Sequence, residues 1–185
     1  MGQRHVEGPS IGVNVRTFRD FDEEKLEVMP YNGSDLEPHY IPPTGPEVSD
    51  LNQSTKRYRG SCHCGNVTYD LHSEPLEEIG VLSCNCSICS RNADLWVYPS
   101  EKDVELRGEE HLTVYRFGRK GSGHAFCRTC GVPVVNKFDH SVDTAPKSMI
   151  GKLPVNVRTI NGIDLKAVKV NKADGKNLIK TPYEV

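Results

Sequence analysis

Residues 60–65 read Gly-Ser-Cys-His-Cys-Gly, and a second pair of cysteines follows at residues 127–131 as Cys-Arg-Thr-Cys-Gly. Between them lies a third packet, Cys-Asn-Cys-Ser-Ile-Cys at residues 84–89. Closely spaced cysteines on a turn can direct their sulfur atoms to one centre, and zinc prefers four such ligands in a tetrahedron. A glycine after each outer packet lets the chain fold back, so that backbone N–H groups approach the sulfurs. The packets therefore predict metal sites that pin distant parts of the chain together.

The number of cysteines indicates which kinds of metal site the chain can form. Seven are present in 185 residues, and an odd count with spacings as short as one residue argues against a disulfide framework. Thiolate ligands in a reducing compartment fit better, so we expect a cytoplasmic protein. Seven sulfurs cannot fill two four-coordinate sites. A two-zinc interpretation therefore gives a closed, structural site of four cysteines and an open, catalytic site of three.

The grouping of the cysteines has two solutions at this point. In the first, the middle packet alone supplies the open site and the two outer packets supply the closed one. In the second, the last two cysteines of the middle packet join Cys127 and Cys130 as a zinc ribbon, which strands the other three. His124, three residues before Cys127, is a further candidate ligand, and a surface histidine is the simpler interpretation. Spacing identifies ligands better than it identifies their grouping.

The first 55 residues differ in composition from the rest. They hold ten acidic and four basic residues and half of the twelve prolines, whereas residues 56–185 carry a net charge of +4. Proline fixes φ and lacks an N–H group, which disfavours helices and central strands. We therefore predict an acidic, proline-rich extension over 1–55, a zinc-binding domain over 56–170 and a C-terminal tail over 171–185. If the extension lies on the domain, isolated apolar residues would anchor it: Tyr31, Tyr40 and Ile41.

From about Tyr58 the chain consists of short alternating runs separated by turns, which is typical of β-strands. Such runs cover residues 67–71, 95–98, 104–106 and 112–117. Asn161-Gly162, between residues 156–160 and 163–168, predicts a hairpin with a type I′ turn. One short turn of helix is expected, after Cys86. The fold class predicted from the sequence is therefore mainly β.

Composition argues against two classes of function. The net charge of the chain is −2, and aromatic residues do not interleave with its basic stretches, so we do not expect a nucleic-acid binder. No apolar run approaches the roughly 18 residues of a membrane span, and we recognise no charged-then-apolar leader. We therefore expect neither nucleic acid nor a membrane as a partner.

These packets, in this order, resemble the glutathione-dependent formaldehyde-activating enzyme (GFA) family, which also includes the centromere-protein-V-like proteins. The resemblance covers about residues 58–160 and rests on residues 60–65, 84–91 and 126–131, where all seven cysteines find a counterpart. Val155-Asn156-Val157-Arg158-Thr159 also looks like the family's strand near the end of the domain. The resemblance implies a β-tent fold of stacked antiparallel sheets with short helical turns, and two zinc ions per chain.

The resemblance also implies which cysteines share a metal ion. The outer packets hold the structural zinc in the family, and the middle packet holds the catalytic zinc. Carried over to this sequence, the structural ligands are Cys62, Cys64, Cys127 and Cys130, and the catalytic ligands are Cys84, Cys86 and Cys89. The middle packet usually reads Cys-His-Cys, and here its centre is Asn85, which cannot act as an acid or a base. We expect Asn85 to support the turn.

A zinc ion with three thiolates is a weak Lewis acid that holds a fourth sulfur or oxygen well. This chemistry and the resemblance predict a carbon–sulfur lyase that forms or cleaves a glutathione adduct such as S-hydroxymethylglutathione. Glutathione is anionic, and seven thiolates outnumber the charge of two zinc ions, so a cation must offset the charge. Arg91, two residues past Cys89, and Arg128 are the expected carboxylate contacts. A homodimer is a candidate assembly.

Three other interpretations stay open. An enzyme with the same chemistry could act on a different thioether or glutathione conjugate in specialised metabolism. A non-catalytic binding module that zinc stabilises is the second, because the family includes centromere-associated proteins. The third is thioredoxin-like redox chemistry at Cys127 and Cys130, which would need a helix after the cysteines, whereas residues 131–135 predict a turn and a strand.

Overall fold

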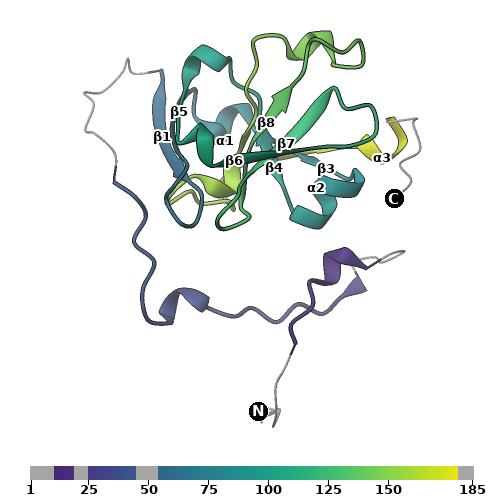
Figure 1. Ribbon diagram of the computed structural model, residues 1–185. Helices are drawn as coiled ribbons and strands as arrows, with labels where there is room; N and C mark the ends of the chain where they lie inside the picture. Colours follow the sequence, from purple (N-terminus) through teal and green to yellow (C-terminus); the bar gives the residue numbers. More distant parts are fainter. Residues whose placement is uncertain (1–10, 19–24, 45–53, 179–185) are drawn as a thin grey trace. The chain divides into compact units, whose positions relative to one another are not determined.

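The computed structural model describes residues 11–18, 25–44 and 54–178 (Figure 1). Parts of the predicted extension (1–10, 19–24 and 45–53) and residues 179–185 of the predicted tail lie outside the described residues. The chain divides into two units, Met1–Tyr31 and Asn32–Val185. The first unit contains a turn of 3₁₀ helix, η1 (Val15–Thr17), whose first N–H groups are capped by Asn14. The second unit carries the sheets and all seven cysteines.

Two sheets form within the described part of the second unit. A three-stranded sheet has the order β1-β2-β5, and a seven-stranded sheet has the order β10-β3-β4-β9-β8-β7-β6. Neighbouring strands are antiparallel, except for the parallel pair of β10 and β3 at one edge. The strands are β1 (Lys56–Ser61), β2 (Thr68–Ser73), β3 (Val81–Cys84), β4 (Leu95–Val97), β5 (Val104–Arg107), β6 (Leu112–Arg116), β7 (Ser122–Cys127), β8 (Pro133–Phe138), β9 (Val155–Asn156) and β10 (Val170–Ala173).

The helices are short. The α-helices are α1 (Leu76–Ile79), α2 (Ser87–Asn92) and α3 (Gly175–Leu178), and the remaining 3₁₀ turns are η3 (Gly33–Asp35), η4 (Glu101–Asp103), η5 (Glu109–His111), η6 (Lys147–Met149) and η7 (Val157–Thr159). Helix α2 is the turn predicted after Cys86. Helices α1 and α3 were not predicted, because four residues carry too little periodicity to be recognised. None of the helices in the described ranges has the length and apolar character needed to cross a bilayer.

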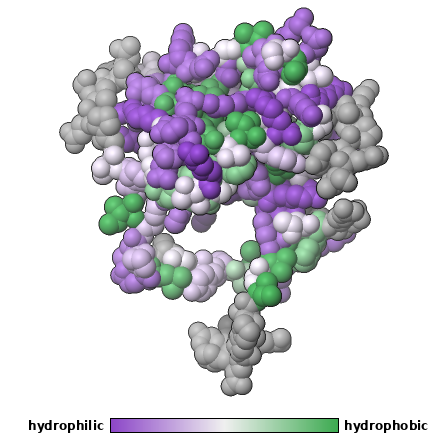
Figure 2. Space-filling model, viewed as in Figure 1, coloured by the Kyte–Doolittle hydropathy of each residue, from purple (hydrophilic) through white to green (hydrophobic). Residues whose placement is uncertain are grey.

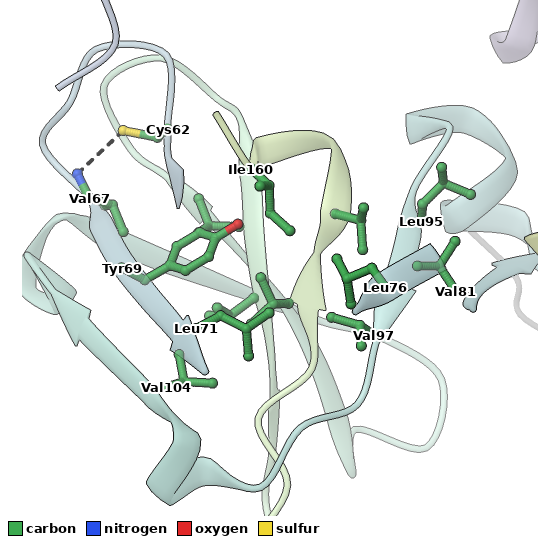
Figure 3. Packing of buried hydrophobic residues seen from close by; sticks show 14 of the residues in the cluster. Cys62, Val67, Tyr69, Leu71, Leu76, Val81, Leu95, Val97, Val104 and Ile160 are labelled. Carbon is green, nitrogen blue, oxygen red and sulfur yellow. Dashed lines mark hydrogen bonds between the residues drawn. The ribbon is translucent and has the colours of Figure 1, made fainter. Parts of the chain in front are cut away.

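The hydrophobic core draws side chains from both sheets (Figure 3). Tyr69 and Leu71 alternate along β2 and point inward, and Val81 and Val97 come from the larger sheet. The hydroxyl of Tyr69 is paired with that of Thr159 at 2.8 Å, so burial of this ring leaves no polar atom unsatisfied. Each such side chain contributes about 1.5–3 kcal/mol when fully buried. On the face of the folded part seen in Figure 2, hydrophilic side chains dominate and hydrophobic ones are scattered among them.

The prediction of a mainly β fold is confirmed, and strands form within or overlapping all four predicted runs. The predicted hairpin around Asn161-Gly162 is wrong. Gly162 does adopt φ +72°, but η7 occupies its first arm and no strand forms within 163–168. The segment instead packs on β1, where Ile160 bridges Gly60 and Asn161 N–H donates to the Arg59 carbonyl at 2.8 Å. Burial of Val157 and Ile160 favours this arrangement over a solvent-facing hairpin.

Candidate metal centres

Four cysteines from the two outer packets meet at one point. Cys62 and Cys64 lie on the turn after β1, Cys127 ends β7, and Cys130 lies on the turn before β8. Their sulfur atoms are within 4.8 Å of one another. The Cys62–Cys64 and Cys64–Cys127 sulfur pairs are each 3.6 Å apart. A tetrahedral zinc ion with bonds of about 2.3 Å requires sulfur atoms about 3.8 Å apart, so this donor set fits zinc.

Each turn of this four-cysteine group is followed by a glycine in the left-handed region. Gly65 and Gly131 adopt φ +78° and +76°, which a residue without Cβ accepts without strain. The chain folds back there, and the N–H of Val67 points at the Cys62 sulfur at 3.3 Å (Figure 3). The expected approach of backbone N–H groups to the thiolates is confirmed at this position.

Backbone N–H groups also affect which thiol of the four-cysteine group has the lowest pKa. Burial raises the pKa of the Cys62 thiol to about 12. Burial acts in the same direction on Cys127, but N–H groups of Cys130 and Thr129 outweigh it and lower its pKa to about 6. A thiolate at Cys127 is thus stabilised by the turn itself, which prepares the group for a cation.

The other three cysteines form a second group at the end of β3. Cys84 ends β3, Cys86 is the N-cap of α2, and Cys89 lies three residues further on the same helix face. Their sulfur atoms are also within 4.8 Å of one another. The N–H of Cys86 donates to the Cys84 sulfur at 3.4 Å. A strand end followed by one turn of helix is therefore sufficient to bring three sulfurs together.

Negative charge is concentrated on one sulfur of this three-cysteine group. Hydrogen bonds from the Cys86 and Cys89 thiols lower the pKa of Cys84 to about 2. The pKa of Cys89 is raised, because its thiol donates to the other two sulfurs and is buried. Three sulfurs so close together cannot all ionise without a cation, and a divalent metal would supply the missing charge.

Side chains from the following strand line the buried side of this group. Trp96 donates its indole N–H to the Cys89 sulfur at 3.4 Å. Burial, followed by the three thiolates, raises the pKa of Tyr98 to about 12. Asp94, Trp96 and Tyr98 alternate, so they share one face of an extended segment. These three residues were not predicted as part of a site from the sequence; the signal for them was an alternation with a period of two that begins five residues after Cys89.

His124 belongs to a third cluster, with Cys89 and Asp94, whose ligand atoms lie within 4.8 Å of one another. Its Nδ1 atom is buried without a hydrogen bond and lies 3.5 Å from Asp94 Oδ2. Asp94 also accepts a hydrogen bond from Asn156 at 3.4 Å. The prediction of a surface histidine is wrong, because His124 is only 7% exposed.

The structure thus brings together the outer four cysteines and, separately, the middle three. No group in the described part of the chain joins Cys86 and Cys89 to Cys127 and Cys130 as a ribbon would. Strand β8 rather than a helix follows Cys130, which removes the thioredoxin-like interpretation.

The two predicted substrate contacts lie on different elements, Arg91 on a helix and Arg128 on a turn. Arg91 is on α2 beside the three-cysteine group, and its guanidinium donates to the Ser87 carbonyl at 2.5 Å. Arg128 is on the turn of the four-cysteine group, and its guanidinium donates to the Glu110 carbonyl at 2.5 Å. Of the two, only Arg91 shares an element with a cysteine of the three-cysteine group, which is Cys89 on α2.

Tyr40, in the predicted extension, contacts the turn of the four-cysteine group. The Tyr40 ring stacks on His63 with ring centres 5.2 Å apart, and its hydroxyl lies 3.4 Å from Ser61 Oγ. Tyr31 and Ile41, the other predicted anchors, are 79% and 82% exposed. A pocket of about 450 Å³ lies beside Tyr40. Its lining includes His63, Arg158 and Asn161 and contains none of the seven cysteines.

A mainly β chain with one group of four cysteines and one of three defines a protein with two candidate metal centres. Residues 57–156, more than half of the chain, match the glutathione-dependent formaldehyde-activating enzyme (GFA) family. The chain belongs to this family of enzymes, and the resemblance recognised in the sequence is confirmed. It is also similar to a Rhodobacter sphaeroides protein, a Northeast Structural Genomics target with a crystal structure. The two share 28% identity over 61% of this chain and 99% of the other, with a TM-score of 0.50.

Proposed function

We propose that the protein is a zinc-dependent carbon–sulfur lyase that forms or cleaves a glutathione adduct such as S-hydroxymethylglutathione. The observation that carries the proposal is the three-cysteine group. It offers three sulfur ligands, one fewer than zinc accepts, whereas the other group is complete with four. Membership of the family supports glutathione and formaldehyde as the chemical class of the substrates.

Zinc suits both donor sets, because cysteine sulfurs are among its preferred ligands, and the sulfur separations of 3.6 Å in the four-cysteine group match a tetrahedron. The structural ion would be held by Cys62, Cys64, Cys127 and Cys130, and the catalytic ion by Cys84, Cys86 and Cys89. When bound at the second group, zinc supplies a Lewis acid that favours a substrate thiolate and polarises a carbonyl. All seven cysteines are free, which suits thiolate ligands in the cytoplasm.

The reaction needs a donor for the aldehyde oxygen and a counter-charge for glutathione. In the forward direction the glutathione sulfur loses its proton and bonds to the carbonyl carbon, the C=O π bond breaks, and the carbonyl oxygen gains one proton, which balances the proton lost by the thiol; cleavage is the reverse. Tyr98 keeps its proton at neutral pH, since its pKa is raised to about 12, so its hydroxyl donates a hydrogen bond to that oxygen. Arg91 supplies the positive charge for a glutathione carboxylate. We assign this contact to Arg91 rather than Arg128, which lies on the turn of the other group.

The test measures exchange between formaldehyde, glutathione and S-hydroxymethylglutathione by NMR with the zinc-loaded full chain. We expect acceleration by the wild type and loss of both activity and one zinc ion in Cys86→Ser. A matched change in the other group, Cys64→Ser, should lose one zinc ion mainly at the expense of thermal stability.

The alternatives make different predictions in the same assay. A zinc-loaded protein that accelerates no glutathione adduct in either direction is a binding module, and the lyase proposal is then wrong. Turnover of a larger thioether or conjugate without turnover of S-hydroxymethylglutathione would keep the chemistry and change the substrate. Light scattering of the zinc-loaded protein distinguishes a homodimer from a monomer.

A further inference from the structure

Asn85, at the centre of the three-cysteine packet, forms hydrogen bonds to a segment distant in sequence through both the nitrogen and the oxygen of its side-chain amide. Its Nδ2 donates to Asp174 Oδ1 at 2.8 Å, and its Oδ1 accepts the backbone N–H of Lys176 at 2.8 Å. The backbone N–H of Asn85 donates to the Ala173 carbonyl at 3.1 Å. Three hydrogen bonds thus join one residue of the cysteine loop to residues 170–178, here named the C-terminal segment.

Strand pairing aligns this C-terminal segment with the cysteine loop. Strand β10 runs parallel to β3, with Val170 opposite Val81 and Ala173 opposite Cys84. The segment therefore reaches the end of β3 where the cysteine packet begins, and α3 turns beside α2 (Figure 1). It follows the residues matched by the family, which end at 156, so the family match does not account for it.

Gly175, in this segment, lies directly against Cys84. Gly175 is buried, and a Cβ atom there would lie 2.5 Å from the Cys84 sulfur and 3.0 Å from the Cys86 Cβ. Only glycine, which has no Cβ atom, lets the backbone at position 175 come this close to Cys84 and Cys86. Its N–H group is also directed at the Cys84 sulfur. No substrate atom has room between the segment and this side of the three-cysteine group.

We propose that Asn85 is a positioning residue that fastens the C-terminal segment over the Cys84 side of the three-cysteine group and thereby restricts which adducts reach it. An asparagine suits this role because one side chain supplies both the donor for Asp174 and the acceptor for Lys176. The restriction of substrates rests on the proposed lyase function, whereas the fastening does not.

Hydrogen exchange of the zinc-loaded full chain tests the fastening. In Asn85→Ala we expect the amides of residues 171–178 to exchange about tenfold faster, because two side-chain hydrogen bonds to the segment are lost. Asn66→Ala is the matched control, since it removes one amide hydrogen bond, to Thr129 at 3.1 Å, beside the other cysteine group. It should leave these amides unchanged. Wild-type exchange in Asn85→Ala would overturn the proposal.

A donor–acceptor swap separates fastening from a general effect on folding. Asn85→Asp places a carboxylate against Asp174 and should release the segment. Adding Asp174→Asn lets the amide at 174 donate to the carboxylate at 85, which still accepts the N–H of Lys176. The amide oxygen at 174 also still accepts the hydrogen bond of Asn177. We expect the double variant to restore slow exchange, and failure to do so would contradict the proposal.

The same variants test the restriction on substrates. With glutathione and either formaldehyde or benzaldehyde, Asn85→Ala should raise kcat/KM for the bulkier aldehyde relative to formaldehyde by about threefold or more, and the double variant should restore the ratio. An unchanged ratio in an active enzyme removes the substrate-restricting part. Absence of turnover in every variant overturns the lyase function, and the exchange data then decide the fastening alone.

Discussion

Tyr98 is a titratable side chain beside the three-cysteine group, and in the proposed lyase reaction it acts in its protonated form. Burial and the nearby thiolates raise its pKa to about 12, so the hydroxyl remains a donor across the neutral range. We predict that Tyr98→Phe lowers kcat by about 10–100-fold with unchanged zinc content, since a buried hydrogen-bond donor is removed and no ligand is lost. Steady-state kinetics and metal analysis measure the two quantities.

The matched control for Tyr98 is Tyr115→Phe on β6, which removes a hydroxyl from a side chain that is 43% exposed. Its kcat should equal that of the wild type. Equal kcat values for Tyr98→Phe and the wild type would mean that another group donates to the substrate oxygen.

His124 lies beside Cys89 without joining the three sulfurs as a common group. We predict that His124→Ala retains two zinc ions per chain, measured by elemental analysis of the purified protein. The free energy of unfolding should fall by about 1–3 kcal/mol, because the buried Asp94 carboxylate loses the imidazole that lies 3.5 Å from it. A decrease to one zinc ion would identify His124 as a ligand instead.

At the residue scale, the sequence was sufficient to select the seven cysteines, because thiolate ligands on turns must be close in sequence. The position of Asp94 and Trp96 beside the three-cysteine group was not predicted, because a single aspartate or tryptophan near a strand looks like an ordinary surface or core residue in the sequence. Their role depends on the face of β4 that meets α2. Packing between elements determines which face of β4 meets α2, and the spacing of residues along the chain does not contain that information.

The three-stranded sheet is held together on one face by a buried carboxylate. Asp70 on β2 is 2% exposed and accepts hydrogen bonds from Arg57 on β1 and Arg107 on β5, at 2.9 and 2.8 Å. Burial opposes ionisation, but the two guanidinium groups outweigh it and lower the pKa of Asp70. One side chain therefore links all three strands.

We predict that Asp70→Asn lowers the free energy of unfolding at pH 7 by about 2–3 kcal/mol. Because the carboxyl pKa is lower in the folded state, its stabilisation is complete above the unfolded pKa of about 3.9 and is lost as the pH falls through the folded value. The wild type should therefore lose this part of its stability below about pH 4, and Asp70→Asn should not. Denaturant titrations at several pH values measure this.

Glu105→Gln is the comparison for Asp70, since it removes another carboxylate that bonds Arg107, at 2.7 Å, but is 63% exposed. An exposed ion pair contributes less than about 1 kcal/mol. A larger effect for Glu105→Gln than for Asp70→Asn would contradict the linking role of Asp70.

At the scale of elements, strands with an alternating pattern were predictable because one face of each is buried. The Asn-Gly hairpin was not a safe prediction, since the flanking residues gain more by packing on β1 than by pairing with each other. Strand β10 was also missed. It is a parallel edge strand whose partner, β3, lies almost ninety residues earlier, and no local turn signals such a pairing.

At the scale of the molecule, the two cysteine groups differ in how much chain they join. The four-cysteine group connects residues 63 positions apart, whereas the three cysteines lie within six consecutive residues. We predict that Cys64→Ser lowers the Tm by about 10 °C or more and Cys86→Ser by only a few degrees, because a constraint on a long loop removes more chain entropy from the unfolded state. Scanning calorimetry of the zinc-loaded variants compares them.

Metal removal provides the reciprocal measurement. A chelator should lower the Tm of the wild type and of Cys86→Ser by similar amounts, since both retain the four-cysteine group. It should change Cys64→Ser much less. Equal responses of the two variants would mean that the groups contribute alike to stability.

The separation of the outer packets also matters while the protein is being made. Ribosomes add about 5–20 residues per second, so Cys64 precedes Cys127 out of the ribosome by roughly 3–13 seconds. During that interval the first turn carries two unpaired thiols with no partner to close the group. Oxidants and competing soft metals would therefore meet these two thiols before Cys127 and Cys130 are present to complete the group.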